Sequence, residues 1–136
     1  MNITPVFISQ LRPGQVFVFG SNERGQHGGG AAKTAIKWGA KWGQGEGLAG
    51  QTYALPTKRD FKTTLSLEKI QGYVNNLEKT VDDHPELHFL ITPVGCGLAG
   101  LTVEQVAPLF RNFMDITNCS LPQEFINQIN NISDEK

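Results

Sequence analysis

The sequence predicts an α/β protein in which a mainly parallel sheet is flanked by helices. Three observations support this fold class: four short apolar runs, a helical pattern after each of them, and glycine clusters where strands should end. Strands that alternate with helices need crossover connections, which produce parallel strands buried on both faces. With 136 residues, of which 39% are hydrophobic and 18% charged, the chain has the composition of one globular domain. We expect its core over about residues 15–130, followed by a polar tail over 131–136.

The first two strands are expected over Val16–Phe19 and Tyr53–Leu55. Each is a short apolar run rich in β-branched or aromatic residues. Between them, Gly30–Trp38 carries apolar residues on one helical face, and Gly39 stands where a helix should stop.

The helix expected over Leu67–Val81 has the clearest periodicity of the chain. Its apolar residues recur with the i, i+3, i+4, i+7 spacing of an amphipathic helix. Ser66 stands at the position of an N-cap. A third strand is expected over Leu87–Val94.

Two further helical patterns follow. Thr102–Met114 opens with the spacing of a capping box between Thr102 and Gln105, and Pro108 is placed to kink this helix. After a weak fourth strand over Thr117–Leu121, Pro122–Ile129 has the pattern of a last helix, with proline in its first turn.

Several functional classes are excluded by composition. No window approaches the ~18 uninterrupted apolar residues of a membrane helix, and the first residues lack the pattern of a secretory signal. We therefore expect a cytoplasmic protein without a membrane partner. Cys96 and Cys119 are expected to be free thiols. Three scattered histidines without a Cys-x-x-Cys spacing predict no metal site, and the sequence predicts no cofactor.

Charge is distributed unevenly along the chain, although the net charge is only -1. Residues 24–62 hold seven basic and two acidic side chains, whereas residues from 63 onward hold four basic and ten acidic ones. A locally basic, glycine-rich segment suits a small anionic ligand, and the near-zero total argues against a broad nucleic-acid footprint. A solvated charged face that binds nothing is the alternative interpretation.

Glycine clusters mark the segments expected to carry function. Ten of the fifteen glycines lie between Gly20 and Gly50, and three more lie between Gly95 and Gly100. Such clusters after strands indicate positive φ angles or the close approach of a backbone or a ligand. The first segment, 20–30, leads from a strand into a helix, where bare amides form an anion-binding concavity and Asn22 can bind ribose hydroxyls. A purely structural turn is the alternative.

The other two glycine segments differ in context. Residues 43–50 lead into a strand and lack a helix dipole, so we expect a flexible surface connection there. Residues 95–100 match G-x-G-x-x-G between a strand and a helix, which favours phosphate contact. A dinucleotide-binding Rossmann unit normally carries this motif after its first strand, so a nicotinamide-dependent dehydrogenase is the lesser alternative.

A cysteine in the third segment and two tryptophans between the first two segments admit two interpretations each. Cys96 is either a nucleophile with His27 as its base or a small residue packed beneath a tight turn, and packing is favoured. Trp38 and Trp42 flank Gly39 and either stack on a base or pack at the helix end, with packing again favoured.

The loops resemble those of the macro-domain superfamily, α/β modules that bind ADP-ribose. Residues 17–22 and 28–32 are similar to the family's asparagine-bearing strand end and glycine-rich loop, which contact the distal ribose. Residues 92–100, with Glu104 and Val106–Ala107 after them, are similar to its second loop, which surrounds the pyrophosphate. The resemblance covers about residues 15–121 and implies a three-layer macro-domain-like fold.

Within the superfamily the chain resembles the branch that contains the terminal ADP-ribose protein glycohydrolase, and also phage and bacterial proteins with the same loop set. The similarity lies in Tyr53–Lys58 and in the Gly-Cys-Gly-Leu run over residues 95–98. In that branch a lysine attacks the ribose C1″ and an aspartate just after the run completes the reaction. Lys58 matches the lysine, but Ala99 stands at the aspartate position.

This departure affects the expected chemistry. General acid–base groups typically contribute ~10²–10⁴-fold to a rate, so hydrolysis without the aspartate should be slow. Asp60, two residues beyond Lys58, is a candidate substitute. Lys58 is alternatively a cation that steers the pyrophosphate.

The sequence thus predicts a binding protein for ADP-ribose or a related nucleotide, with hydrolysis of ADP-ribose from modified protein or nucleic acid as its possible activity. The alternatives are a non-catalytic nucleotide sensor or sponge and a structural module of phage origin. The candidate catalytic residues are Lys58 and Asp60. The candidate ligand-binding residues all lie in the first and third glycine segments: Ser21, Asn22, His27, Gly28, Gly29, Gly30, Gly95, Cys96, Gly97, Leu98, Ala99 and Gly100.

Overall fold

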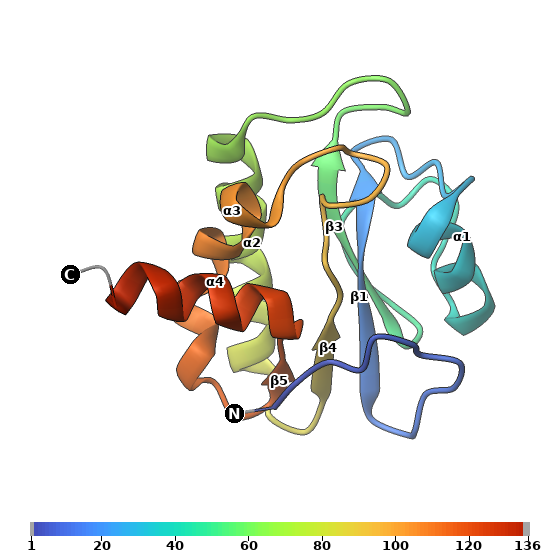
Figure 1. Cartoon of the computed structure of the whole chain (residues 1–136). Helices are drawn as coiled ribbons and strands as arrows, with labels where there is room; N and C mark the ends of the chain where they lie inside the picture. The colour runs from blue at the N-terminus through green and yellow to red at the C-terminus, as the bar shows by residue number, and fades with distance from the viewer. Residues whose placement is uncertain (1, 135–136) are drawn as a thin grey trace.

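The computed structural model describes residues 2–134 and contains a five-stranded sheet with helices on both faces (Figure 1). The sheet order is β2-β3-β1-β4-β5. The strands are β1 (Gln15–Asn22), β2 (Gly47–Ala49), β3 (Thr52–Lys58), β4 (His88–Ile91) and β5 (Cys119–Ser120). The helices are α1 (Gly30–Ala35), α2 (Leu67–Asp83), α3 (Val103–Val106) and α4 (Gln123–Asp134), with 3-10 helices η1 (Ile36–Trp38) and η2 (Ala107–Asp115). The predicted α/β class is confirmed.

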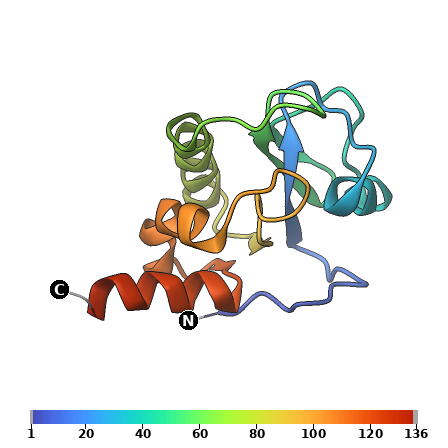
Figure 2. The same ribbon diagram turned by 45° about the horizontal axis from the view of Figure 1, so that its top comes forward.

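The sheet is mixed. Strand β1 lies between β3 and β4 and pairs in parallel with both, and β5 pairs in parallel with β4. Strand β2 runs antiparallel to β3. Because parallel strands end at the same edge of a sheet, the loops that follow β1, β3 and β4 gather at one edge, as Figure 2 shows.

The two faces of β1 pack against different layers. Val16 and Val18 belong to the larger core cluster, which contains side chains of α2, η2 and α4. Phe17 and Phe19 belong to a smaller cluster that includes Ala35 of α1. Side chains alternate across a strand, so one apolar run supplies both cores. Figure 2 shows α1 across the sheet from α2 and α4.

Most of the helix signals have the expected local effect. The Ser66 side chain accepts a hydrogen bond from Lys69 N at the start of α2, and Thr102 with Gln105 forms a capping box on α3. The helix expected over Thr102–Met114 changes to the 3-10 form at Ala107. Pro108 lies in the first turn of η2, where its missing N–H costs no hydrogen bond, whereas inside an α-helix it would break one.

Three boundaries differ from the expectations. Residues 43–50, expected to be a flexible connection, contain β2. In the chain before residue 15, expected to lie outside the core, Ile3 forms an isolated parallel bridge with Leu121 just after β5, and Thr4 N donates to Leu121 O at 2.8 Å. Helix α4 continues to Asp134, so residues 131–134 of the expected tail are helical, and residues 135–136 lie outside the described residues.

Two other findings concern the described residues 2–134. No helix there has both the length and the apolar character that crossing a bilayer requires. Cys96 and Cys119 are free thiols, and burial raises the pKa of Cys119 to about 12.

A glycine contact fixes residues 43–50 against the end of β1. A Cβ atom added to Gly45 would lie 2.4 Å from Asn22 O and 2.6 Å from Glu23 O. The Ser21 hydroxyl also donates a hydrogen bond to Gly45 O. The two backbones therefore pack directly together, and only glycine leaves enough room at this position.

Replacing Gly45 should destabilise the fold. We expect Gly45→Ala to lower the free energy of unfolding by ~1–3 kcal/mol, because the new methyl group forces the backbones apart. Gly72→Ala is the matched control: it adds the same atom to an exposed position of α2 with no neighbour within 4 Å, and it should stabilise by ~0.5–1 kcal/mol. Urea denaturation measures both, and a Gly45→Ala variant as stable as the unmodified chain would contradict the close packing.

Candidate functional site

A cleft of about 950 Å³ opens at the edge of the sheet where β1, β3 and β4 end. Its volume lies in the range of small-molecule sites. Of the predicted residues, ten line it: Ser21, Asn22, Gly28, Gly29, Gly30, Lys58, Gly95, Gly97, Leu98 and Ala99. Four others are absent from the lining: His27, Asp60, Cys96 and Gly100. The first and third glycine segments therefore face each other across one cavity.

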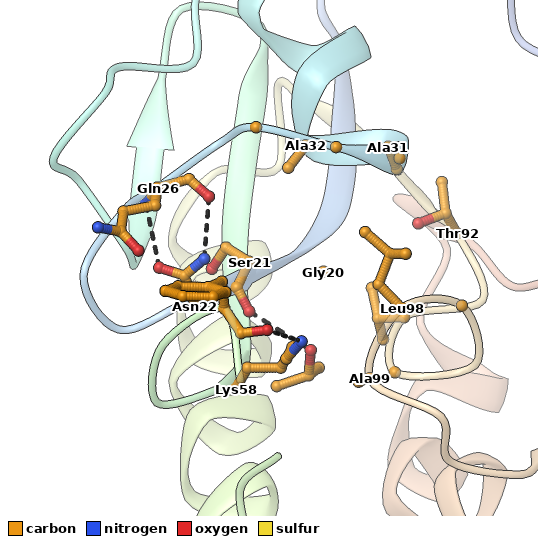
Figure 3. A pocket seen from close by; sticks show the side chains of 18 of the residues that line it. Gly20, Ser21, Asn22, Gln26, Ala31, Ala32, Lys58, Thr92, Leu98 and Ala99 are labelled. Atoms are coloured by element: carbon orange, nitrogen blue, oxygen red, sulfur yellow. Dashed lines mark hydrogen bonds between the residues drawn. The ribbon is translucent and has the colours of Figure 1, made fainter. Parts of the chain in front are cut away.

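Asn22 organises the first glycine segment. Its Nδ2 donates to Gln26 O at 2.9 Å, and its Oδ1 accepts from Gln26 N at 3.0 Å (Figure 3). The residue is 8% exposed. Since a side-chain amide nitrogen carries two hydrogens, one donor remains after the loop is closed. Asn22 thus shapes the loop and keeps one amide hydrogen that the bond to Gln26 does not use.

The third glycine segment, residues 95–100, is a compact turn after β4. Cys96 N donates to Pro93 O at 3.2 Å, Gly100 N to Gly97 O at 3.0 Å and Leu101 N to Gly95 O at 2.9 Å. Gly95 has a φ of +80°, which an L side chain rarely adopts. Within residues 2–134, the amides of Gly97, Leu98 and Ala99 donate no hydrogen bond to the chain. Three donors are therefore left beside the cleft.

Leu98 connects the two walls. Its side chain is 74% exposed and projects toward the start of α1 (Figure 3). A Cβ atom at Gly29 would lie 3.3 Å from Leu98 Cδ1, and one at Gly30 would lie 3.4 Å from it. The glycines therefore leave space for Leu98, and the walls approach each other there.

Among the described residues that line the cleft, only Lys58 has a titratable side chain. It ends β3, and its Nζ donates to Phe61 O at 2.6 Å. Asp60 serves the turn after β3: its Oδ1 accepts from Lys62 N and from Thr63 N, each at 2.9 Å. The backbone hydrogen bond from Lys62 is the main reason that the pKa of Asp60 is lowered. Asp60 is thus held in the turn, while Lys58 lines the cleft.

His27 and Cys96 lie on opposite faces of the sheet. His27 is 2% exposed, and its Nε2 contacts Lys41 O at 2.9 Å and Gln44 O at 3.1 Å. Both partners are carbonyls, so Nε2 is the donor. Cys96 packs against the α2 side of the core, where burial raises the pKa of its thiol. The packing interpretation therefore describes Cys96, and the Cys96–His27 pairing does not form.

Two aromatic side chains line the cleft, although the sequence favours packing for Trp42 and does not single out Phe61. Trp38 packs edge-on against Phe17, with ring centroids 4.9 Å apart, as the packing interpretation expects. Trp42 instead is 66% exposed and lines the cleft. Phe61 is also 66% exposed and lines it. No periodic pattern in the sequence singles out Phe61, although an aromatic residue just after the end of a predicted strand is a usable signal.

Glu23 links the ends of β1 and β3 to helix α2. Its backbone N donates to Lys58 O at 2.8 Å. Its carboxylate accepts a hydrogen bond from the Tyr73 hydroxyl and pairs with Lys69 Nζ at 3.1 Å. The bond from Tyr73 is the main cause of the lowered pKa of Glu23, and the same bond, with burial, raises the pKa of Tyr73 to about 12. The carboxylate of Glu23 thereby holds the end of β1, just after Asn22, against α2.

Fold and site together define an α/β protein with a cleft between two glycine-rich turns. No family model, curated protein or solved structure matches the chain.

Removing the Tyr73 hydroxyl should have a pH-dependent effect on stability. The pKa of Glu23 is below its ordinary value of 4.5 in the folded chain, so its interactions stabilise the fold above that pH and are lost as pH falls through the lowered pKa. We expect Tyr73→Phe to lower the free energy of unfolding by ~1 kcal/mol at pH 7 and by less as pH falls below 4.5 and through the lowered pKa of Glu23. Urea denaturation at a series of pH values from 7 downward measures this. A difference that stays constant would show that Tyr73 acts through packing alone.

Proposed function

We propose that the chain binds ADP-ribose, or a close relative of it, in the cleft at the ends of β1, β3 and β4. The observation that carries the proposal is the arrangement of the cleft: two glycine-rich turns face each other with backbone amides exposed, and Lys58 supplies a positive charge. A diphosphate needs several donors and little steric obstruction, which bare amides provide.

The resemblance to macro domains implies how ADP-ribose would be oriented in the cleft. Its diphosphate would lie between Gly28–Gly30 and Gly97–Ala99, and its distal ribose near Asn22 and Lys58. Asn22 keeps one amide hydrogen for a ribose hydroxyl. Lys58, the last residue of β3, lines the same cleft and would attract the neighbouring phosphate through its positive charge.

Binding without turnover is the form of this function that the site supports best. Lys58 faces the cleft, but Ala99 stands where the similar glycohydrolases carry an aspartate, and Asp60 is engaged with backbone amides. Nothing in the described lining offers a second titratable group for acid–base chemistry. A reader or sponge of ADP-ribose requires only the amides and the cation.

Hydrolysis is a second candidate, and the position of Lys58 favours it. A lysine at the end of β3 can attack C1″ as in the similar glycohydrolases. The bond from C1″ to the modified protein or nucleic acid then breaks, that group leaves with a proton, and water releases ADP-ribose from the lysine. The glycine-loop amides would stabilise the developing charge. The substrate would then be ADP-ribosylated protein or nucleic acid.

Calorimetry with ADP-ribose tests the binding proposal. We expect saturable binding to the unmodified chain, and ligand at ~100 times its dissociation constant should stabilise the fold by ~2.7 kcal/mol. Gly28→Leu and Gly97→Leu should abolish binding, because both positions line the cleft and have open space around an added Cβ. Gly72→Leu, on the exposed face of α2, should bind normally. If no ADP-ribose, NAD or related nucleotide raises the melting temperature, a structural module is favoured instead.

A release assay decides between binding and hydrolysis. The chain is incubated with ADP-ribosylated protein and with ADP-ribosylated nucleic acid, and free ADP-ribose is measured. We expect no release by the unmodified chain, and slow release by Ala99→Asp if the missing acid–base group is what limits turnover. Release by the unmodified chain that Lys58→Gln abolishes would establish hydrolysis.

A further inference from the structure

Two exposed aromatic side chains line the same cleft from different loops. Trp42 comes from the turn between η1 and β2, and Phe61 from the turn after β3. Each is 66% exposed. Single exposed apolar residues are ordinary on a protein surface, but two aromatic rings in one nucleotide-sized cleft indicate a contact surface for a planar group.

The backbone on both sides of Trp42 is fixed. His27 Nε2 donates to Lys41 O before it and to Gln44 O after it, and the His27 ring lies edge-on to Trp42 with centroids 6.3 Å apart. His27 itself is buried against Phe19 of β1. Trp42 is thus presented by a braced turn, and little conformational freedom would be lost when a ligand binds.

Phe61 is braced independently. Lys58 Nζ holds its carbonyl at 2.6 Å, and Asp60 accepts the amides of Lys62 and Thr63. Arg59 N also donates to Thr63 O at 2.8 Å. The turn is therefore closed around Phe61, while its ring stays in the cleft.

The aromatic end of the cleft is positively charged. Lys62 Nζ lies 5.3 Å from the centroid of the Phe61 ring, and Lys58 lines the same wall. Aromatic faces combined with cations suit a planar base that carries a phosphate, because the ring stacks while the cations meet the negative charge. An uncharged apolar partner would leave these cations without a counter-charge.

We propose that Trp42 and Phe61 form a base-stacking subsite that holds a heteroaromatic base of the bound nucleotide. This inference rests on the proposed function and adds the part of the ligand that the glycine turns do not contact. The base is either adenine or a ring attached to the distal ribose, as in NAD. In both cases the same two rings supply the stacking surface.

Calorimetry with paired ligands tests the subsite. NAD carries both adenine and a ring on the distal ribose, whereas 5-phosphoribosyl diphosphate offers a diphosphate without a base. Trp42→Ala and Phe61→Ala should each weaken NAD binding by about tenfold or more, within the range for losing a base–aromatic stack, and should change 5-phosphoribosyl diphosphate binding by less than about twofold. Phe7→Ala, which removes an aromatic ring that is 89% exposed outside the cleft, should change neither. Ligand-free melting temperatures confirm that the variants fold.

AMP and nicotinamide mononucleotide then identify the base. The mononucleotide whose affinity falls in both variants carries the ring that the subsite holds. If both variants bind ADP-ribose and both mononucleotides as tightly as the unmodified chain, the subsite is overturned while the proposed function stands. If the chain binds a mononucleotide through the two rings but not ADP-ribose, the subsite stands and the proposed function fails. Absence of binding to every nucleotide overturns both.

Discussion

The parallel pairing of β1 with both of its neighbours is the constraint on which the cleft depends. β1 pairs with β3 from Phe17 opposite Thr52 and with β4 up to Val18 opposite Ile91. All three strands therefore end at one edge, and each delivers its following loop to the same place. At Gly20, on the lining of the cleft, an added Cβ would lie 3.5 Å from both Gly95 N and Thr57 Oγ1, so the ends of the three strands are in contact distance of one another. The apolar alternation of β1 holds this geometry between two helical layers.

A second requirement is that glycine-rich loops remain in one conformation. Glycine has the largest loss of backbone freedom on folding, so these turns need specific bonds. Asn22 closes the first turn through Gln26, Glu23 links it to α2 through Tyr73, and His27 joins it to the residues around Trp42. Asn22, predicted as a ligand contact, and His27, considered as a base, therefore hold the backbone of these loops in position.

The predictable parts of the structure have local signals. The α2 helix, its Ser66 cap and the capping box at Thr102 follow from spacing alone, because the interacting residues are three or four positions apart. Strand β2 was missed because three residues, Gly47–Ala49, show no alternation and form a strand only against β3. The same limit applies within the site. The glycine turns were predicted from composition and strand ends, whereas the positions of Phe61 and Asp60 depend on how one turn closes, which no short pattern encodes.

A crystal structure of the chain with ADP-ribose would show whether the amides of the two turns enclose the diphosphate. We expect phosphate oxygens within about 3 Å of amide nitrogens from both Gly28–Gly30 and Gly97–Ala99, with Leu98 displaced or packed against the ligand. A nucleotide bound elsewhere, or a cleft still bridged by Leu98 at saturating ligand, would contradict it.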